Sequence, residues 1–246
     1  MAPRVLIRRI GWGLIWISVL IFAFLGYQLV VTDLLNQRVQ TQAKVDLAAD
    51  LAARRVELPE PEVVTVDEGP TPTTEPDTPP TTEPEVSFIP EQAGPEGATL
   101  GRIVIPKIEL DDVMFEGVTR DTLKKGPGHM PGTPVPGQPG NAVVSGHRTT
   151  YGRPFYDLDA LSYGDRIEVE TATGMHVYEV RNTLIVDPTD VSVTKPIAGA
   201  WLTLTTCNPR FSAAERLVVQ AVLVSGPNLD YANLLAKQAD GSEKST

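Results

Sequence analysis

The sequence contains one cysteine, Cys207, so this residue has no partner for an intramolecular disulfide. Such a residue is either a reactive thiol or a small buried apolar side chain. Cys207 ends the segment WLTLTTC, and strand alternation places it on the same polar face as Thr203 and Thr205. A position at the end of a strand, just before Asn208, favours a thiol that reaches solvent.

A cysteine nucleophile needs a neighbouring base or cation to form its thiolate. His147 is the preferred candidate, because it follows the apolar segment NAVVS where a strand passes into a loop. His129, in a Gly- and Pro-rich loop, is the second candidate. His176 lies within an expected hairpin strand, which favours a structural role.

Acyl transfer also needs a positive or hydrogen-bond-donating group where the oxyanion forms. Arg216 lies nine residues after Cys207 and opens the next expected strand. If those two strands are neighbours, Arg216 returns to Cys207; otherwise it is a solvated surface charge. No cluster of His, Asp and Glu requires a metal, and no cofactor is expected.

The elements that must position these residues begin near residue 98. Short apolar stretches separated by turns predict a mainly β fold, a closed or nearly closed barrel of seven or eight strands. The strands are expected at residues 100–106, 108–115, 141–145, 165–171, 175–186, 201–207 and 216–224. Short helices are expected at residues 119–125, 155–161 and 231–238, and a Gly- and Pro-rich loop at 126–140. The catalytic domain is therefore expected over 98–230, followed by a short helix and tail over 231–246.

The N-terminus predicts a membrane anchor. Residues 10–31 contain no charge and are long enough to cross a hydrocarbon core of ~30 Å. Three arginines precede them, so residues 1–9 are expected in the cytoplasm and the remainder of the chain outside it. The alternative is a cleaved signal peptide, whose apolar region is shorter and ends at small residues.

Two segments separate this anchor from the barrel. Residues 32–58 are rich in Ala, Leu and Gln, which predicts a juxtamembrane helix or, alternatively, a solvated stalk. Residues 59–97 are rich in Pro, Thr and Glu, and they predict a disordered, semi-rigid spacer between membrane and catalytic domain. Residues 59–96 carry ten Asp and Glu without Lys or Arg, which accounts for the net charge of −10. No basic stripe exists to neutralise phosphates, so a nucleic-acid partner is excluded.

Around the candidate catalytic residues Cys207, His147 and Arg216, the sequence resembles the sortases. The segment TLTTCNPRFSAAER, residues 203–216, resembles the signature TLxTC followed nine residues later by Arg. The segment SGHR, residues 145–148, resembles the end of the strand that carries the family's catalytic histidine. Together with GPGH and the later pattern YGRPF–DL–GD, these motifs look most like class E, over roughly residues 98–226.

This resemblance implies an eight-stranded sortase β-barrel and a cysteine transpeptidase of a Gram-positive bacterium. Such enzymes cleave a C-terminal sorting signal of secreted proteins, LAxTG or LPxTG, between Thr and Gly. They then join the Thr carbonyl to an amine of a peptidoglycan precursor. Cys207 corresponds to the nucleophile, His147 to the general acid, and Arg216 to the group that stabilises the oxyanion or positions the substrate.

The resemblance also implies substrate-binding residues. Thr205 and Thr206 match positions that line the family's groove, and Met130 replaces an aromatic residue that often follows GPGH in class E. Two other functions fit the same residues: a cysteine endopeptidase that hydrolyses the signal, and an inert membrane-tethered scaffold with an incidental cysteine. A transfer product that forms only with an added amine distinguishes a transpeptidase from the endopeptidase. A reactive Cys207 thiol distinguishes an enzyme from the inert scaffold.

Overall fold

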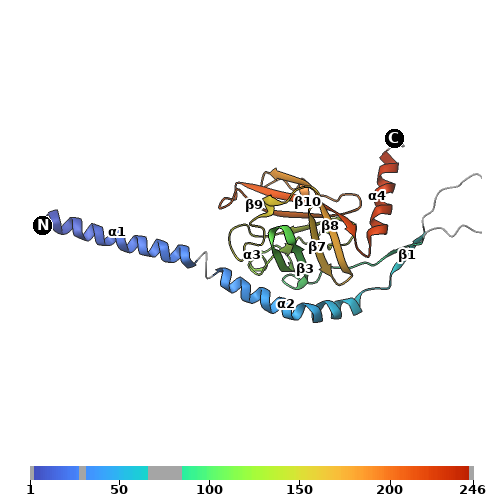
Figure 1. Cartoon of the computed structure of the whole chain (residues 1–246), viewed down its shortest axis with the longest axis horizontal. Helices are drawn as coiled ribbons and strands as arrows, with labels where there is room; N and C mark the ends of the chain where they lie inside the picture. Colours follow the sequence, from blue (N-terminus) through green and yellow to red (C-terminus); the bar gives the residue numbers. More distant parts are fainter. Residues whose placement is uncertain (1–2, 28–31, 66–84, 244–246) are drawn as a thin grey trace, which may run out of the picture.

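The computed structural model describes residues 3–27, 32–65 and 85–243. Two helices come first, followed by a two-stranded sheet, a β-barrel and a C-terminal helix (Figure 1). The helices are α1 (Pro3–Gly26), α2 (Thr32–Glu57), α3 (Arg120–Leu123) and α4 (Leu229–Glu243). The strands are β1 (Glu62–Thr65), β2 (Glu85–Phe88), β3 (Thr99–Ile105), β4 (Leu110–Glu116), β5 (Gly128–His129), β6 (Gly140–Ser145), β7 (Arg166–Thr171), β8 (Gly174–Val186), β9 (Ala200–Asn208) and β10 (Glu215–Ser225).

Strands β3 to β10 close into one barrel in the order β10-β8-β7-β3-β4-β5-β6-β9, with β9 pairing back to β10. This confirms the predicted closed eight-stranded barrel. Neighbouring strands are antiparallel except β4 with β5 and β6 with β9, which run parallel. Parallel strands bring their carboxyl ends to the same edge, so the end of β6 lies beside the end of β9. In that register Ser145 is the neighbour of Thr205.

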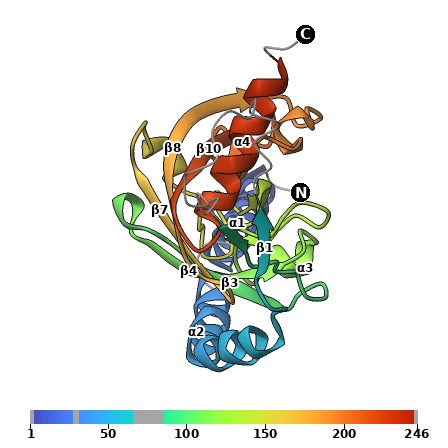
Figure 2. The ribbon, with the colours of Figure 1, turned by 90° about the vertical axis from the view of Figure 1, so that its right-hand side faces the viewer.

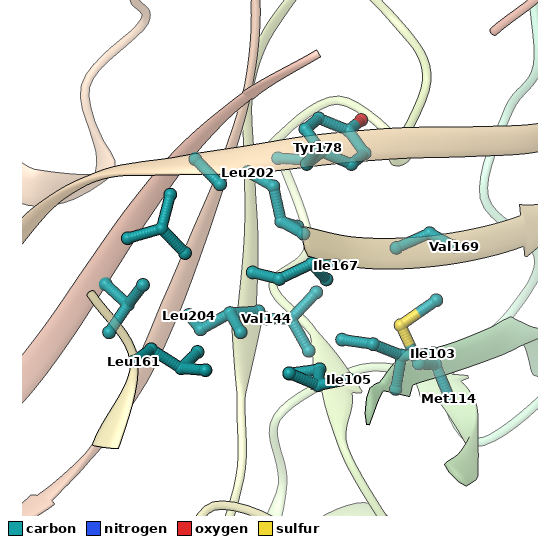
Figure 3. Packing of buried hydrophobic residues seen from close by; sticks show 14 of the residues in the cluster. Ile103, Ile105, Met114, Val144, Leu161, Ile167, Val169, Tyr178, Leu202 and Leu204 are labelled. Carbon is teal, nitrogen blue, oxygen red and sulfur yellow. The ribbon is translucent and has the colours of Figure 1, made fainter. Parts of the chain in front are cut away.

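Alternate side chains of the barrel strands point inward and form one apolar core (Figure 3). Ile103 of β3, Val169 of β7 and Leu204 of β9 are fully buried there. Tyr178 of β8 is buried as well, and its hydroxyl accepts a hydrogen bond from the backbone N–H of Gly137 at 2.6 Å. This packing makes the barrel a rigid support for the residues at its edge.

Helix α1 contains the predicted apolar segment. Its stretch Ile7–Gly26 is long and apolar enough to cross a membrane, and almost all of its side chains are exposed. Residues 28–31, the end of the predicted span, lie outside the described residues.

Residues 32–57 form helix α2 and not a solvated stalk. In Figures 1 and 2 the helix lies along one side of the barrel. Leu47 and Leu51 of α2 form a small second core with Val113 and Phe115 of β4. Asp33 in the first turn, and basic residues in the last, complement the helix dipole.

A glutamine of α2 completes the edge of β4. The Gln40 amide nitrogen donates to the Val113 carbonyl at 3.0 Å, and its oxygen accepts the Val113 N–H at 2.8 Å. Strand β5 pairs with β4 only at Phe115 and Glu116, so it leaves Val113 without a strand partner on that side. The Gln40 side chain therefore takes the place of a neighbouring strand.

The segment 59–97, where a disordered spacer is expected, contains a short strand near each end of its undescribed central part. Strands β1 and β2 pair with each other, and α2, which precedes the segment, already packs on the barrel. Glu91 is buried and accepts hydrogen bonds from Arg54 of α2 and Thr171 of β7. Composition indicates that an acidic segment stays solvated, but these partners compensate the buried charge. Residues 66–84 lie outside the described residues.

Three expected local elements differ in extent. Helix α4 runs from Leu229 to Glu243 and is longer than expected, and its Tyr231 ring packs on Phe88 of β2 with centroids 4.6 Å apart. The helix expected over 155–161 is only the 3-10 turn Leu158–Ala160. The loop expected over 126–140 contains the short strand β5, which the hydrophobic pattern is too brief to show.

Candidate active site

The end of β9 places Cys207 between two other strands of the barrel. Cys207 is directly opposite Arg216 in the antiparallel β9–β10 register, which meets the condition that the two strands be neighbours. On its other side β9 pairs with β6, where Thr205 lies beside Ser145. His147 follows two residues after Ser145, so all three predicted residues come to one edge of the barrel.

His147, Cys207 and Arg216 all line one cavity of about 310 Å³. Each of the three side chains is half-buried, so each is accessible from the cavity and partly shielded from water. Cys207 is a free thiol. A cavity with a thiol, an imidazole and a guanidinium on its wall can carry out nucleophilic acyl transfer.

The segment between β8 and β9, residues 187–199, forms the opposite wall. Asp190, Val191 and Val193 line the cavity from this side. Asn141 of β6 donates to the Val193 carbonyl at 2.9 Å and accepts a hydrogen bond from the Thr203 hydroxyl at 2.7 Å. This wall was not predicted from the sequence, because the segment has no strong periodic pattern.

The face of β9 that carries Cys207 is less exposed than strand alternation predicts. Thr203 is fully buried beneath this wall, whereas Thr205 and Cys207 are half-buried at the cavity. Thr206, expected on the core-facing side with Leu204, also lines the cavity.

Hydrogen bonds to β9 fix the segment that carries His147. The Gly146 N–H donates to the Thr205 carbonyl at 3.1 Å, and the Thr206 hydroxyl donates to the Gly146 carbonyl at 2.7 Å. Residue 146 must be glycine, because a Cβ there would lie 2.6 Å from the ring of Phe155. His147 is thus tied to the same strand that carries the thiol.

The environment of His147 favours its neutral form. Burial lowers the pKa of His147, and the positive charge of Lys124 lowers this pKa further. The Tyr151 ring lies against the imidazole, with centroids 5.1 Å apart. At neutral pH the imidazole is therefore ready to accept a proton.

The Arg216 guanidinium is fixed at one nitrogen and free at the others. Its Nη1 donates to the carbonyls of Ala213 and Glu215, at 3.1 and 3.0 Å. Within the described parts of the chain, no other hydrogen bond or ion pair engages this side chain. Its remaining N–H groups are available to an oxygen in the cavity.

Arg148 is a residue of the site that sequence reasoning missed. It is 4% exposed and donates to the Asn208 side-chain oxygen at 2.5 Å and to the Cys207 carbonyl at 3.3 Å. It also pairs with Asp159 at 2.9 Å. In the sequence Arg148 is the last residue of the SGHR segment, but nothing in that segment indicates that its side chain binds the residues around Cys207. Arg148 therefore supports the Cys207 backbone from beneath.

The other two histidines lie away from the cavity. His129 is buried, with Nδ1 at 2.6 Å from the Glu116 carboxylate and Nε2 at 2.9 Å from the Pro134 carbonyl. His176 is buried too, with Nε2 at 3.0 Å from the Thr173 hydroxyl. Burial lowers the pKa of His176 to about 4. Both imidazoles are placed to support the structure.

The three predicted substrate-binding residues also line the cavity. Thr205 and Thr206 contribute from β9, and Met130 follows β5 directly. The Met130 backbone is fixed by a hydrogen bond from its N–H to the Val143 carbonyl at 2.8 Å. The cavity therefore combines hydroxyl groups next to the thiol with a flexible apolar side chain on the wall.

Comparisons with known proteins cover the same part of the chain. The family model for the sortase domain matches residues 103–224. The chain is 34% identical to Sortase SrtE1 of Streptomyces coelicolor over 136 residues, which is 49% of this chain and 39% of that protein. It is 36% identical to Sortase D of Bacillus subtilis over 126 residues, which is 51% of this chain and 60% of that protein.

A solved structure agrees with these relatives. The structure of sortase E from Streptomyces avermitilis superimposes with a TM-score of 0.50 at 36% identity, covering 54% of this chain and 91% of that chain. The match to the two curated relatives, Sortase SrtE1 and Sortase D, spans less than two thirds of the length of each.

Proposed function

The chain belongs to the sortase family, and from this premise we propose that it is a membrane-anchored cysteine transpeptidase. Its substrates are secreted proteins with a C-terminal sorting signal, LAxTG-like or LPxTG-like. It cleaves the signal between Thr and Gly and joins the Thr carbonyl to an amine of a peptidoglycan precursor. One observation carries the proposal: Cys207 and Arg216 are opposite one another in a cavity that His147 also lines.

In the first step the enzyme is acylated. Neutral His147 takes the proton of the Cys207 thiol, and the sulfur attacks the carbonyl carbon of Thr. Arg216 donates hydrogen bonds to the oxygen that becomes negative. The bond from that carbon to the glycine nitrogen then breaks, and His147 gives its proton to the departing amine. The products are a thioester on Cys207 and a free glycine amine.

In the second step the acyl group is transferred. The acceptor amine attacks the thioester carbon, its proton passes to His147, and the carbon–sulfur bond breaks. The proton returns to the Cys207 sulfur, so the enzyme is restored. Water in place of the amine produces hydrolysis, and the wall formed by residues 187–199 supports transfer because it shields the thioester from solvent.

The residues around the thiol suit an extended peptide. We assign Thr205 and Thr206 to the backbone of the signal and Met130 to its second residue, because Met130 lies on the wall. An unbranched thioether adapts to a small or a cyclic side chain alike. The preference between Ala and Pro in the signal is therefore a property to be measured.

The N-terminus supports a location at the cell membrane. Helix α1 supplies an apolar span, and Arg4, Arg8 and Arg9 mark its cytoplasmic end. The barrel, which follows the span, faces the outside. Secreted proteins and cell-wall precursors meet the enzyme on that side.

The test is product analysis with the full chain in detergent. LAxTG and LPxTG peptides are incubated with and without an added amine, and the products are identified by mass, with Cys207→Ala as the control. A transfer product that forms only with the amine supports a transpeptidase. Cleavage to the free acid with or without the amine identifies a hydrolase, and no cleavage of either peptide contradicts the proposal.

A further inference from the structure

The first turn of α2 contacts the loop that follows His147. The carboxylate of Asp33 accepts the backbone N–H of Gly152 at 3.0 Å, and its second oxygen lies 3.3 Å from Nε of Arg153. Asp33 is largely buried by these contacts, with 17% of its side chain exposed. A charged group of the helix next to the membrane segment thus binds the backbone of an active-site loop.

The contacted loop has an unusual backbone that needs external support. Tyr151, Gly152 and Arg153 have φ values of 52°, 78° and 52°, all in the left-handed region that residues with side chains rarely adopt. A Cβ at Gly152 would lie 2.1 Å from the side-chain oxygen of Asn36. The helix therefore approaches the loop so closely that only glycine fits between them.

The same helix turn holds a second segment beside His147. The Asn36 amide nitrogen donates to the backbone carbonyls of Lys124 and Lys125, both at 2.9 Å. Lys124 is the cation whose charge acts on His147. Two neighbouring residues on one face of α2 thus fix both segments that surround the imidazole.

Tyr151 completes the connection from the helix to the site. Its ring lies against the His147 ring, with centroids 5.1 Å apart, and it directly precedes Gly152. We propose that Asp33 is a positioning residue: through the Gly152 and Arg153 contacts it holds Tyr151 against His147 and keeps the imidazole shielded and oriented. Its effect on catalysis rests on the role proposed above for His147.

The groups that face His147 determine how its titration responds when the contact of Asp33 with Gly152 and Arg153 is lost. They are Lys124 before β5, Tyr151 in the same loop, Asp190 on the opposite wall, Cys207 on β9 and Arg216 on β10. Replacing Asp33 removes the charge of none of these groups, and Tyr151 is the one whose position depends on Asp33. The expected change is increased hydration of His147 as Tyr151 moves away, and hydration reverses the effect of burial, so the imidazole titrates at higher pH than in the wild type.

The experiment compares Asp33→Ala with a control on the same helix, Asp46→Ala. Asp46 accepts a hydrogen bond from Gln42 within α2, and among the described residues no hydrogen bond or ion pair joins it to the barrel. The His147 titration is followed by NMR on full-length protein with labelled histidine in detergent, and the signal is assigned with His147→Ala. Acylation is measured with a sorting-signal peptide across pH.

We expect Asp33→Ala to move the His147 titration upward and to lower the rate of acylation about tenfold at unchanged KM. Asp46→Ala should match the wild type, and Asp33→Glu should restore part of the rate. Arg153→Ala, which keeps the Gly152 hydrogen bond, should show a smaller change in the same direction, and it carries the test if Asp33→Ala does not fold. Identical titrations and rates in the Asp33→Ala and Asp46→Ala proteins would overturn the assignment. If the wild type formed no thioester, the proposed function would fail, while the His147 titration would still decide the role of Asp33.

Discussion

Cys207 and Arg216 are direct cross-strand neighbours, although nine residues separate them in the sequence. Residues opposite one another in an antiparallel pair have Cβ atoms about 4.5–5.5 Å apart and point to the same face. The backbone hydrogen bonds of the barrel thus fix where the two side chains begin, and the carbonyls of Ala213 and Glu215 then hold the guanidinium. In the proposed mechanism, this arrangement preorganises Cys207 and Arg216 for the same carbonyl group.

Replacing Cys207 with alanine should abolish the thioester. The sequence has no second cysteine, so a mass increase equal to the acyl part of the peptide reports on this residue alone. We expect no acyl adduct and no cleavage in Cys207→Ala. Its thermal unfolding midpoint should stay close to that of the wild type, because the side chain is small and only half-buried. Cleavage by a folded Cys207→Ala protein would remove the assignment of the nucleophile.

Arg216→Lys should lose activity even though it keeps the charge. The guanidinium can donate to the Ala213 and Glu215 carbonyls and still present other N–H groups to the cavity, and an ammonium group lacks this fixed planar arrangement. We expect kcat to fall about 10²–10³-fold, as is typical when one oxyanion donor is removed. Single-turnover acylation measures this step directly, and near-normal turnover by Arg216→Lys would show that only the charge matters.

Lys124→Ala should shift the pH dependence of acylation. Burial and then the Lys124 charge lower the pKa of His147, so removing this cation favours the imidazolium and raises that pKa. The acid limb of the pH profile, where His147 becomes protonated and can no longer accept the thiol proton, should therefore move to higher pH.

The matched control for that shift is Lys237→Ala on α4, which removes the same charge away from the cavity. Its pH profile should overlay that of the wild type. A shift of equal size in both proteins would indicate an effect of net charge and not of the contact between Lys124 and His147.

Buried His176 should make the fold sensitive to acid. Its pKa is lowered to about 4, whereas an unfolded histidine binds its proton near pH 6.5, so the unfolded state takes up the proton first. Stability is therefore lost as the pH falls from 6.5 toward 4, by about 3 kcal/mol in total. Denaturant unfolding of the wild type and His176→Gln at a series of pH values measures this slope.

The effect of His176 is read from the difference in the pH dependence of stability between the wild type and His176→Gln. A second group changes the stability in the opposite direction as the pH falls. Burial raises the pKa of Asp112 to about 6, so its contribution favours the folded state as the pH falls through that range. Both proteins retain Asp112. If the two slopes were the same between pH 4 and 6.5, His176 would not be the source of acid sensitivity.

The barrel strands and the approach of Arg216 to Cys207 could be predicted because the signals are local. Alternating residues define each strand, and a connection of six residues between β9 and β10 allows few arrangements other than a hairpin. The position of His147 beside them required the parallel pairing of β6 with β9. That pairing joins strands far apart in the sequence, and no sequence pattern indicates it.

The docking of α2 could not be predicted from hydrophobic periodicity. Three of its five buried residues are polar, since Thr32, Asn36 and Gln40 occupy the positions where apolar residues would have revealed an amphipathic helix. Asn36 and Gln40 bind backbone groups of the catalytic domain, which a sequence pattern does not show. Glu91 escaped prediction for the same reason, because its ion pair with Arg54 joins two segments that composition treats as solvated.

The Gln40 contact with Val113 has a consequence for how the barrel behaves without its N-terminal helix. An unpaired strand edge is a template on which another chain can add a strand, and natural folds cover such edges to remain monomeric. Removing residues 32–57 would uncover the backbone N–H and carbonyl of Val113 on β4, together with the apolar side chains of Val113 and Phe115 that α2 covers. The isolated barrel would then associate edge to edge and precipitate. Helix α2 therefore protects the barrel against aggregation.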